Sequence, residues 1–169
     1  MDMTQEGAHI ARQDAARSLA QPKAGEYLTY RLGAEHYGVD IQKVQEIRSY
    51  EPPTRVPGAP PFVKGVVNLR GVIVPIVDLR LRLDCERAAY DSFTVVIVLA
   101  VNQRVAGVVV DSVSDVIDLD AEAIRPPPEL ASDGPDFITG MASVAERMLM
   151  LVDMDALLGD TLGAVGAAG

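Results

Sequence analysis

The stretch from Lys64 to Leu79, which reads KGVVNLRGVIVPIVDL, constrains the fold of this chain more than any other. Two largely apolar, β-branched runs flank Arg70-Gly71, and runs of this length favour two short buried strands over one helix. Gly71 can adopt the positive φ that a tight hairpin turn requires. Pro75 has no amide hydrogen to donate, so we expect the second strand to be an edge strand or to be bulged there. Because this hairpin is so apolar, we expect it to lie in the core of the protein rather than on its surface.

Length and composition narrow the class of protein. A chain of 169 residues accommodates one compact domain or two small barrels with a common core. Aromatic residues make up only 5% and Trp is absent, so we expect an aliphatic core. The single cysteine, Cys85, excludes an intramolecular disulfide and a cysteine-based metal site. The acidic start predicts no signal peptide, and the longest apolar run, Val95–Val101, is too short to span a membrane, so we expect a cytoplasmic protein.

The charge of the chain is unevenly spread. Residues 1–90 carry 12 Lys and Arg against 11 Asp and Glu, whereas residues 91–169 carry 3 against 13. An acidic half argues against nucleic-acid binding, which depends on neutralising phosphates with Lys and Arg. Such asymmetry can steer a protein partner, although solubility alone explains it equally well.

The remaining chain predicts about ten short strands, frequent Gly or Pro turns and scarcely any helix. Residues 26–32 alternate as a half-buried strand does, and His36 is expected to lie exposed in the following turn. Residues 94–101 and 105–113 form a second hairpin, in which Gly107 predicts a bulge or a barrel corner. Asp153 is expected to cap a short helix over 154–158. Residues 1–24 and 161–169 are predicted to be mobile tails, and the domain to be an all-β barrel or pair of barrels.

Chemistry-bearing motifs are missing from the sequence. There is no HExxH, CxxC, GxSxG, P-loop or GxGxxG. His9 and His36 are far apart, and the acidic neighbours of Cys85 would raise rather than lower the pKa of its thiol. We therefore expect a non-enzymatic interaction module without metal or cofactor. A small-molecule or oligonucleotide-binding barrel would need a basic groove with exposed aromatics, which this composition does not favour.

A specific pattern of motifs points further. YGVDI at 37–41, KVQEIR at 43–48, FVKGVVNLRGVIVPIVDLR at 62–80, RVAGVVVDSVSDV at 104–116 and IRPPPE at 124–129 occur in this order. Together they resemble the CheW family of bacterial chemotaxis coupling proteins over about residues 25–160. The NLRGxxxPxxDL element is also found in the regulatory domain of the histidine kinase CheA, and the length of 169 residues favours the coupling protein.

The resemblance implies two intertwined five-stranded SH3-like barrels that share a core, followed by a short C-terminal helix. It also implies a non-enzymatic adaptor that binds chemoreceptor tips and the regulatory domain of CheA, within receptor arrays beneath the inner membrane and without inserting into the membrane. The alternative is a coupling protein of a parallel chemosensory pathway that does not control flagellar motility.

The resemblance also assigns candidate contact residues. Receptor or kinase contacts are expected at Val44, Glu46, Arg70, Val95, Val96 and Val116. Since neighbouring residues of a strand face opposite sides, at least one of Val95 and Val96 must pack inside. A turn has no structural need for a guanidinium, whose donors suit a partner's carboxylate, so Arg70 is expected to lie at an interface, oriented by Glu46.

A second kinase contact is expected along the proline-rich segment, at Arg125, Glu129 and Leu130. Leu130 stands where many relatives carry an aromatic residue, which weakens the expected anchor. Structural turn roles are expected for Gly65, Gly71 and Gly107.

Overall fold

The computed structural model describes residues 24–83, 90–127 and 137–159. Apart from Ala24, the two predicted tails lie outside these residues, as do Cys85, Glu129 and Leu130.

Ten strands account for most of the described residues. They are β1 (Gly25–Leu32), β2 (Glu35–Asp40), β3 (Val44–Ser49), β4 (Val63–Leu69), β5 (Val72–Asp78), β6 (Val95–Val101), β7 (Arg104–Val110), β8 (Ser112–Leu119), β9 (Ile138–Val144) and β10 (Arg147–Val152). The helical elements are short: η1 (Ile41–Lys43), α2 (Leu79–Arg82), η2 (Ala121–Ala123) and a C-terminal helix over 154–159. None of the helices in the described residues is long and apolar enough to cross a membrane.

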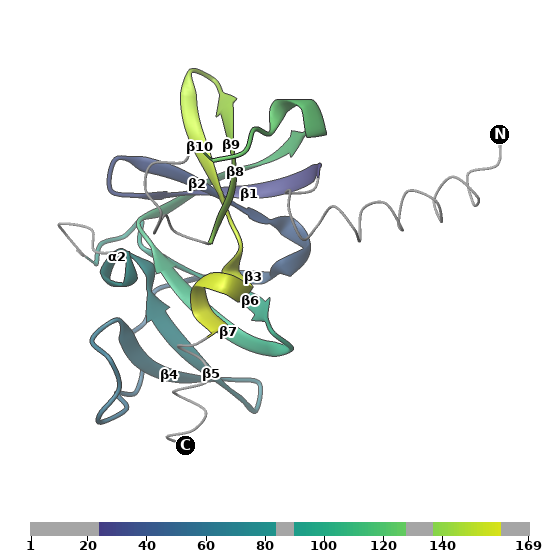
Figure 1. Cartoon of the computed structure of the whole chain (residues 1–169). Helices are drawn as coiled ribbons and strands as arrows, with labels where there is room; N and C mark the ends of the chain where they lie inside the picture. Colours follow the sequence, from purple (N-terminus) through teal and green to yellow (C-terminus); the bar gives the residue numbers. More distant parts are fainter. Residues whose placement is uncertain (1–23, 84–89, 128–136, 160–169) are drawn as a thin grey trace.

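The strands form two five-stranded mixed sheets. One has the order β8-β1-β2-β10-β9 and is built from both ends of the chain, and we call it the terminal barrel. The other has the order β3-β6-β7-β5-β4 and is built from the middle of the chain, and we call it the middle barrel. The hairpins β9–β10 and β4–β5 lie at opposite ends of the molecule (Figure 1). The chain leaves the terminal barrel after β2 and returns at β8, which confirms the predicted intertwined architecture.

A short backbone bridge connects the two edge strands of each sheet. Thr54, which follows β3, pairs with Val66 of β4, and Arg125, which follows β8, pairs with Met141 of β9. Each bridge consists of two N–H···O hydrogen bonds of 2.8–2.9 Å. These bridges give hydrogen-bond partners to backbone N–H and C=O groups of the edge strands, which could otherwise pair with another chain.

The two barrels repeat the same local devices. Asp78 donates its N–H to the carbonyl of Phe62, and Asp153 donates its N–H to the carbonyl of Phe137, both at 2.8 Å. Each aspartate side chain then accepts a backbone N–H from the first turn of the helix that follows its strand. The predicted cap by Asp153 is therefore present. The segments 62–83 and 137–158 are structural equivalents, 75 residues apart.

The core has three parts. A central core joins both barrels, and it includes Tyr30 of β1, Leu99 of β6 and Leu158 of the C-terminal helix. Each barrel also encloses a small apolar cluster of its own. Strand β1 therefore buries both faces, with Leu28 toward the central core and Tyr27 toward the terminal barrel, so the prediction of a half-buried strand was wrong. The expectation of a purely aliphatic core was also wrong, because three tyrosines are buried.

Strand β5 lies inside the middle barrel, between β7 and β4, so it is not the edge strand that was one of the two expected possibilities. It is not bulged at Pro75 either, because the register shift of this hairpin lies in β4, between Val63 and Gly65. Pro75 pairs with Val66, whose N–H and C=O point away from β5 toward Thr54. This makes the pair a non-hydrogen-bonded one, so the nitrogen of Pro75 faces β7. The ladder to β7 begins only at Ile76, and the missing donor interrupts no ladder bond.

Three further local predictions need correction. His36 lies in β2, half-buried, and pairs with Arg31, because the turn before it is only two residues long. The predicted strand over 105–113 ends at Val110, since Asp111 separates β7 from β8. Gly107 carries no bulge, because the β6–β7 register runs through it without a shift.

Candidate functional site

The hairpin turn between β4 and β5 is held by its own motif. Arg70 has a φ of 54° and Gly71 a φ of 90°, as the two central residues of a type I′ turn require. The Asn68 side chain accepts the N–H of Gly71 at 2.8 Å. The turn therefore presents the Arg70 side chain outward, with 71% of it exposed. Sequence reasoning missed the role of Asn68, although an Asn three residues before a turn glycine is a recognisable signal.

Glu46 of β3 is the partner of Arg70, as the sequence analysis expected. Its Oε2 accepts from the Arg70 guanidinium at 2.5 Å, and its Oε1 accepts from Arg48 at 3.1 Å. The hydrogen bonds from these two arginines hold the pKa of Glu46 below its ordinary value. Glu46 therefore stays ionised and positions a cationic group at the tip of the hairpin.

Apolar side chains surround this charged group. Val72 and Ile73, which follow the turn, are 51% and 60% exposed. Beside them lies a cavity of about 240 Å³ whose lining includes Leu69, Arg70 and Val72. We call Glu46, Arg48, Arg70, Val72 and Ile73 the turn surface. An exposed apolar area with a fixed charge is typical of a protein-binding surface.

The two edge strands carry exposed aliphatic residues at equivalent positions. Ile47 of β3 pairs with Ile97, and Val116 of β8 pairs with Leu28. Both inner partners belong to the central core, so Ile47 and Val116 lie on the faces that the two barrels turn toward each other. Ile47 is 45% and Val116 46% exposed. The sequence analysis singled out Val116 but missed Ile47.

The other candidate valines are mostly packed. Val96 is buried inside the middle barrel. Val44 and Val95 are half-buried and pack against the central core. The structure thus brings Glu46 and Arg70 together in one group, with Val44 at the start of the same strand as Glu46, and places Val116 on the other barrel.

Of the second predicted contact, only Arg125 lies within the described residues. Its side chain is exposed, while its backbone is fixed by the bridge to Met141 of β9. Glu129 and Leu130 fall outside them.

Gly65 and Gly107 lie within β4 and β7, so the expected turn role is wrong for these two glycines, and both are required by close approach instead. A Cβ on Gly65, whose φ is 143°, would lie 2.1 Å from the carbonyl oxygen of Thr54, at the bridge that connects β3 to β4. A Cβ on Gly107 would lie 2.7 Å from Ile76 and 2.8 Å from Val96. Gly71 has open space around it, so its requirement comes from its φ alone.

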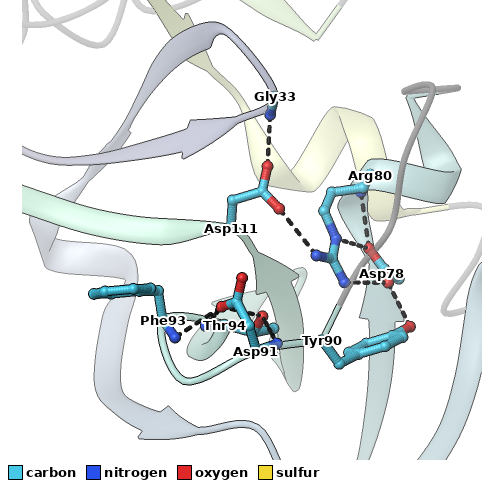
Figure 2. Close-up of polar contacts among 8 residues, drawn as sticks. All are labelled: Gly33, Asp78, Arg80, Tyr90, Asp91, Phe93, Thr94 and Asp111. Atoms are coloured by element: carbon cyan, nitrogen blue, oxygen red, sulfur yellow. Dashed lines mark hydrogen bonds and ion pairs between the residues drawn. The ribbon is translucent and has the colours of Figure 1, made fainter.

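A buried ionic network lies where the barrels meet, and the sequence analysis did not foresee it (Figure 2). Arg80 of α2 is fully buried and donates from Nε and one terminal nitrogen to the two carboxylate oxygens of Asp78, at 3.0 and 2.9 Å. Its other terminal nitrogen donates to Asp111 at 2.9 Å. Tyr90 donates its hydroxyl to Asp78 at 2.7 Å, and its ring lies against the guanidinium.

Burial and hydrogen bonding act on the network in opposite directions. Burial alone would raise the pKa of Asp78, but the hydrogen bonds from Arg80 and Tyr90 outweigh it and the pKa is lowered. For Tyr90, burial and the bond to ionised Asp78 both raise the pKa of the phenol. Asp78, Arg80 and Tyr90 therefore keep their ordinary charge states at neutral pH, so the network indicates structural support rather than proton transfer.

Catalytic geometry is not apparent in the part of the chain that the structure describes. No group of three or more His, Cys, Asp or Glu side chains there is arranged to hold a metal ion.

Comparisons with known proteins agree with this picture. Residues 26–162 match the family model described as a CheW-like domain. The chain is 55% identical over 134 residues to the chemotaxis protein CheW of Klebsiella aerogenes, covering 79% of this chain and 81% of the relative. It is 40% identical over 133 residues to CheW of Rhizobium meliloti, covering 78% and 86%. The crystal structure of the scaffolding protein TtCheW from Thermoanaerobacter tengcongensis matches with a TM-score of 0.74 at 30% identity, covering 80% of this chain and 92% of that one.

Two five-stranded mixed sheets, a fixed arginine at the NLRG turn and these similarities lead to one conclusion. The chain belongs to the CheW family of non-enzymatic chemotaxis coupling proteins, which link chemoreceptors to the kinase CheA.

Proposed function

We propose that this chain couples chemoreceptors to CheA through the turn surface, within receptor arrays at the inner membrane. The observation that carries the proposal is the Glu46–Arg70 pair at an exposed hairpin tip. Within the described residues, the side-chain hydrogen bonds of Arg70 go to Glu46 alone. A guanidinium has five donors, so further donors remain available for a carboxylate of the partner. Val72 and Ile73 add apolar area around that polar anchor.

The edge-strand residues Ile47 and Val116 extend the proposal to a second surface. They lie on equivalent strands of the two barrels, on the faces directed toward the central core. An adaptor that joins two partners needs two surfaces. We assign Ile47 and Val116, with Val44 at the start of β3, to the second of them.

Substitution of Arg70 tests the turn surface. We expect Arg70→Ala to weaken binding to CheA or to receptor cytoplasmic fragments at least about tenfold, since a charged hydrogen bond contributes about 1.5–3 kcal/mol. Its urea midpoint should stay near that of the wild type, because removing an exposed side chain costs within about 0.5 kcal/mol. Calorimetric titration with each partner measures both affinities.

Arg31→Ala is the matched control, because Arg31 is an exposed arginine on β1 of the terminal barrel. It should bind both partners as the wild type does. If Arg70→Ala binds both partners normally, or if it lowers stability by as much as it weakens binding, the turn surface is not the contact.

We further propose that the segment beginning at Arg125 is a separate contact used in assembly. The bridge to Met141 fixes the backbone of Arg125, and Pro126 and Pro127 restrict the residues after it, so little ordering entropy is lost when a partner binds. Arg125→Glu combined with Leu130→Ala should leave one-to-one binding of CheA within about twofold of the wild type. The same variant should prevent larger assemblies with receptor and CheA, measured by sedimentation. If the double variant forms assemblies of normal size, the segment is only a connector between strands and not a contact.

A further inference from the structure

The hairpin turn of each barrel is held from outside by a carboxylate. In the terminal barrel, the N–H of Gly33 in the β1–β2 turn donates to Asp111 at 2.6 Å. Asp111 in turn accepts from Arg80 of the middle barrel at 2.9 Å (Figure 2). We call Gly33, Asp111 and Arg80 the inner clamp.

The middle barrel has an equivalent contact. The N–H of Asn102 in the β6–β7 turn donates to Asp155 of the C-terminal helix at 2.9 Å. Asp155 also pairs with Lys43 of η1 at 3.1 Å. We call Asn102, Asp155 and Lys43 the outer clamp.

The two clamps lie at equivalent positions of the two barrels, but the cation and the carboxylate exchange places between them. Arg80 and Asp155 are both the second residue after the aspartate that caps their helix. Asp111 and Lys43 both lie in the connection through which the chain passes from one barrel to the other. The helix supplies the cation of the inner clamp and the carboxylate of the outer one.

The two clamps differ in how far their side chains are exposed to solvent. The side chains of Arg80 and Asp111 are 0% and 21% exposed, whereas those of Lys43 and Asp155 are 43% and 31% exposed. Salt screens an exposed ion pair strongly and a buried pair much less. The inner clamp should therefore be permanent and the outer clamp adjustable.

The outer clamp is close in sequence to the turn surface. Lys43 immediately precedes β3, and Glu46, which holds Arg70, comes three residues later. Asp155 lies in the C-terminal helix, whose Leu157 and Leu158 pack into the central core. A shift of Lys43 relative to Asp155 would therefore act on the residue directly before the strand that carries Glu46.

We propose that the outer clamp is a salt-sensitive latch that regulates the turn surface. When it opens, the Asn102 turn and the residues leading into β3 are released, and the position of Glu46 and Arg70 changes, while the inner clamp stays closed. The regulatory part of this inference rests on the proposed function of the turn surface.

Amide exchange of the full-length chain, measured by NMR, tests the latch. Lys43→Met removes the cation of the outer clamp, and Lys64→Met is the matched control because Lys64 lies outside both clamps, beside the Tyr90 ring. At low salt the amide of Asn102 should exchange about two- to fivefold faster in Lys43→Met than in the wild type or the control. At about 1 M NaCl, where the screening length is only about 3 Å, the wild type should approach Lys43→Met. The amide of Gly33 should respond to neither change.

Equal exchange of Asn102 in Lys43→Met and the wild type would overturn the latch, as would a salt response of Gly33 as large as that of Asn102. Titration with CheA at low salt tests the regulatory part, and Lys43→Met should change the affinity about two- to fivefold. If Lys43→Met speeds the amide exchange of Asn102 but leaves the affinity for CheA unchanged, the latch exists but does not regulate the turn surface. A wild-type chain that binds neither CheA nor receptor fragments would overturn the proposed function, whereas the amide measurements judge the latch independently.

Discussion

At the scale of single residues, Gly71 and Gly107 are required for different physical reasons. Gly71 has a φ of 90°, and no atom beyond its own chain neighbours lies within 4 Å of the place where a Cβ would be. Gly107 has no positive φ, but a Cβ there would overlap Ile76 and Val96. At the equivalent residue of the terminal barrel, Gly38, a Cβ would lie 3.1 Å from Leu151 of the parallel strand β10, which is a less severe approach.

These reasons predict different responses to asparagine at the two positions, because asparagine tolerates positive φ better than a β-branched residue does. Gly71→Val should cost about 1–3 kcal/mol of unfolding free energy and Gly71→Asn clearly less. Gly107→Asn and Gly107→Val should both lower the unfolding free energy by about 1–3 kcal/mol, because any side chain overpacks the site. Urea denaturation of the four variants measures the differences. Equal costs for the two substitutions at Gly71 would show that φ is not the limiting factor there.

At the scale of elements, α2 depends on the buried pair of Asp78 and Arg80. The pKa of Asp78 is lower in the folded chain than its ordinary value, so Asp78 adds stability above the ordinary pKa of about 4. That stability is lost as the pH falls through the folded pKa. Acid should therefore loosen the connection among α2, Tyr90 and Asp111.

Asp78→Asn should lower the unfolding free energy at pH 7 by about 3–5 kcal/mol, because it leaves a buried arginine with only part of its counter-charge. The variant should also lose less stability than the wild type between pH 7 and about pH 3, since the titrating group is gone. Urea denaturation at the two pH values checks both statements. Asp120→Asn is the control, because Asp120 is exposed and makes no side-chain cap bond to η2. An unchanged pH dependence in Asp78→Asn would rule out Asp78 as the source.

At the scale of the whole molecule, the central core makes the two barrels one folding unit. It draws residues from β1 and β2 of the terminal barrel, from β4 to β7 of the middle barrel, and from the C-terminal helix. A barrel separated from this core would expose the inner face of its sheet, so neither barrel is expected to unfold alone.

Leu99→Ala tests this unity, because Leu99 of β6 is fully buried in the central core. We expect a loss of about 2–5 kcal/mol and a single unfolding transition. Native-state amide exchange should accelerate by the same factor in β10 of the terminal barrel and β5 of the middle barrel. Acceleration confined to the middle barrel would show that the barrels open separately.

The sequence by itself determined the local devices of this protein. Arg70-Gly71 between two apolar runs was sufficient for the hairpin, because turn conformation depends on adjacent residues. Asp153 before the short segment 154–158 was sufficient for the helix cap. The ordered motifs were sufficient for the family and thereby for the two-barrel fold.

Tertiary structure alone decided which faces are buried and which charges meet. Alternation showed that Val95 and Val96 face opposite sides, but only the two barrel interiors and the central core determine how deeply each is buried. Arg80 is fully buried, yet its partner Asp111 is 31 residues away, and the two meet only because α2 lies in contact with β7, which ends just before Asp111. Contacts of this kind depend on the packing of distant segments, and no local pattern of residues encodes them.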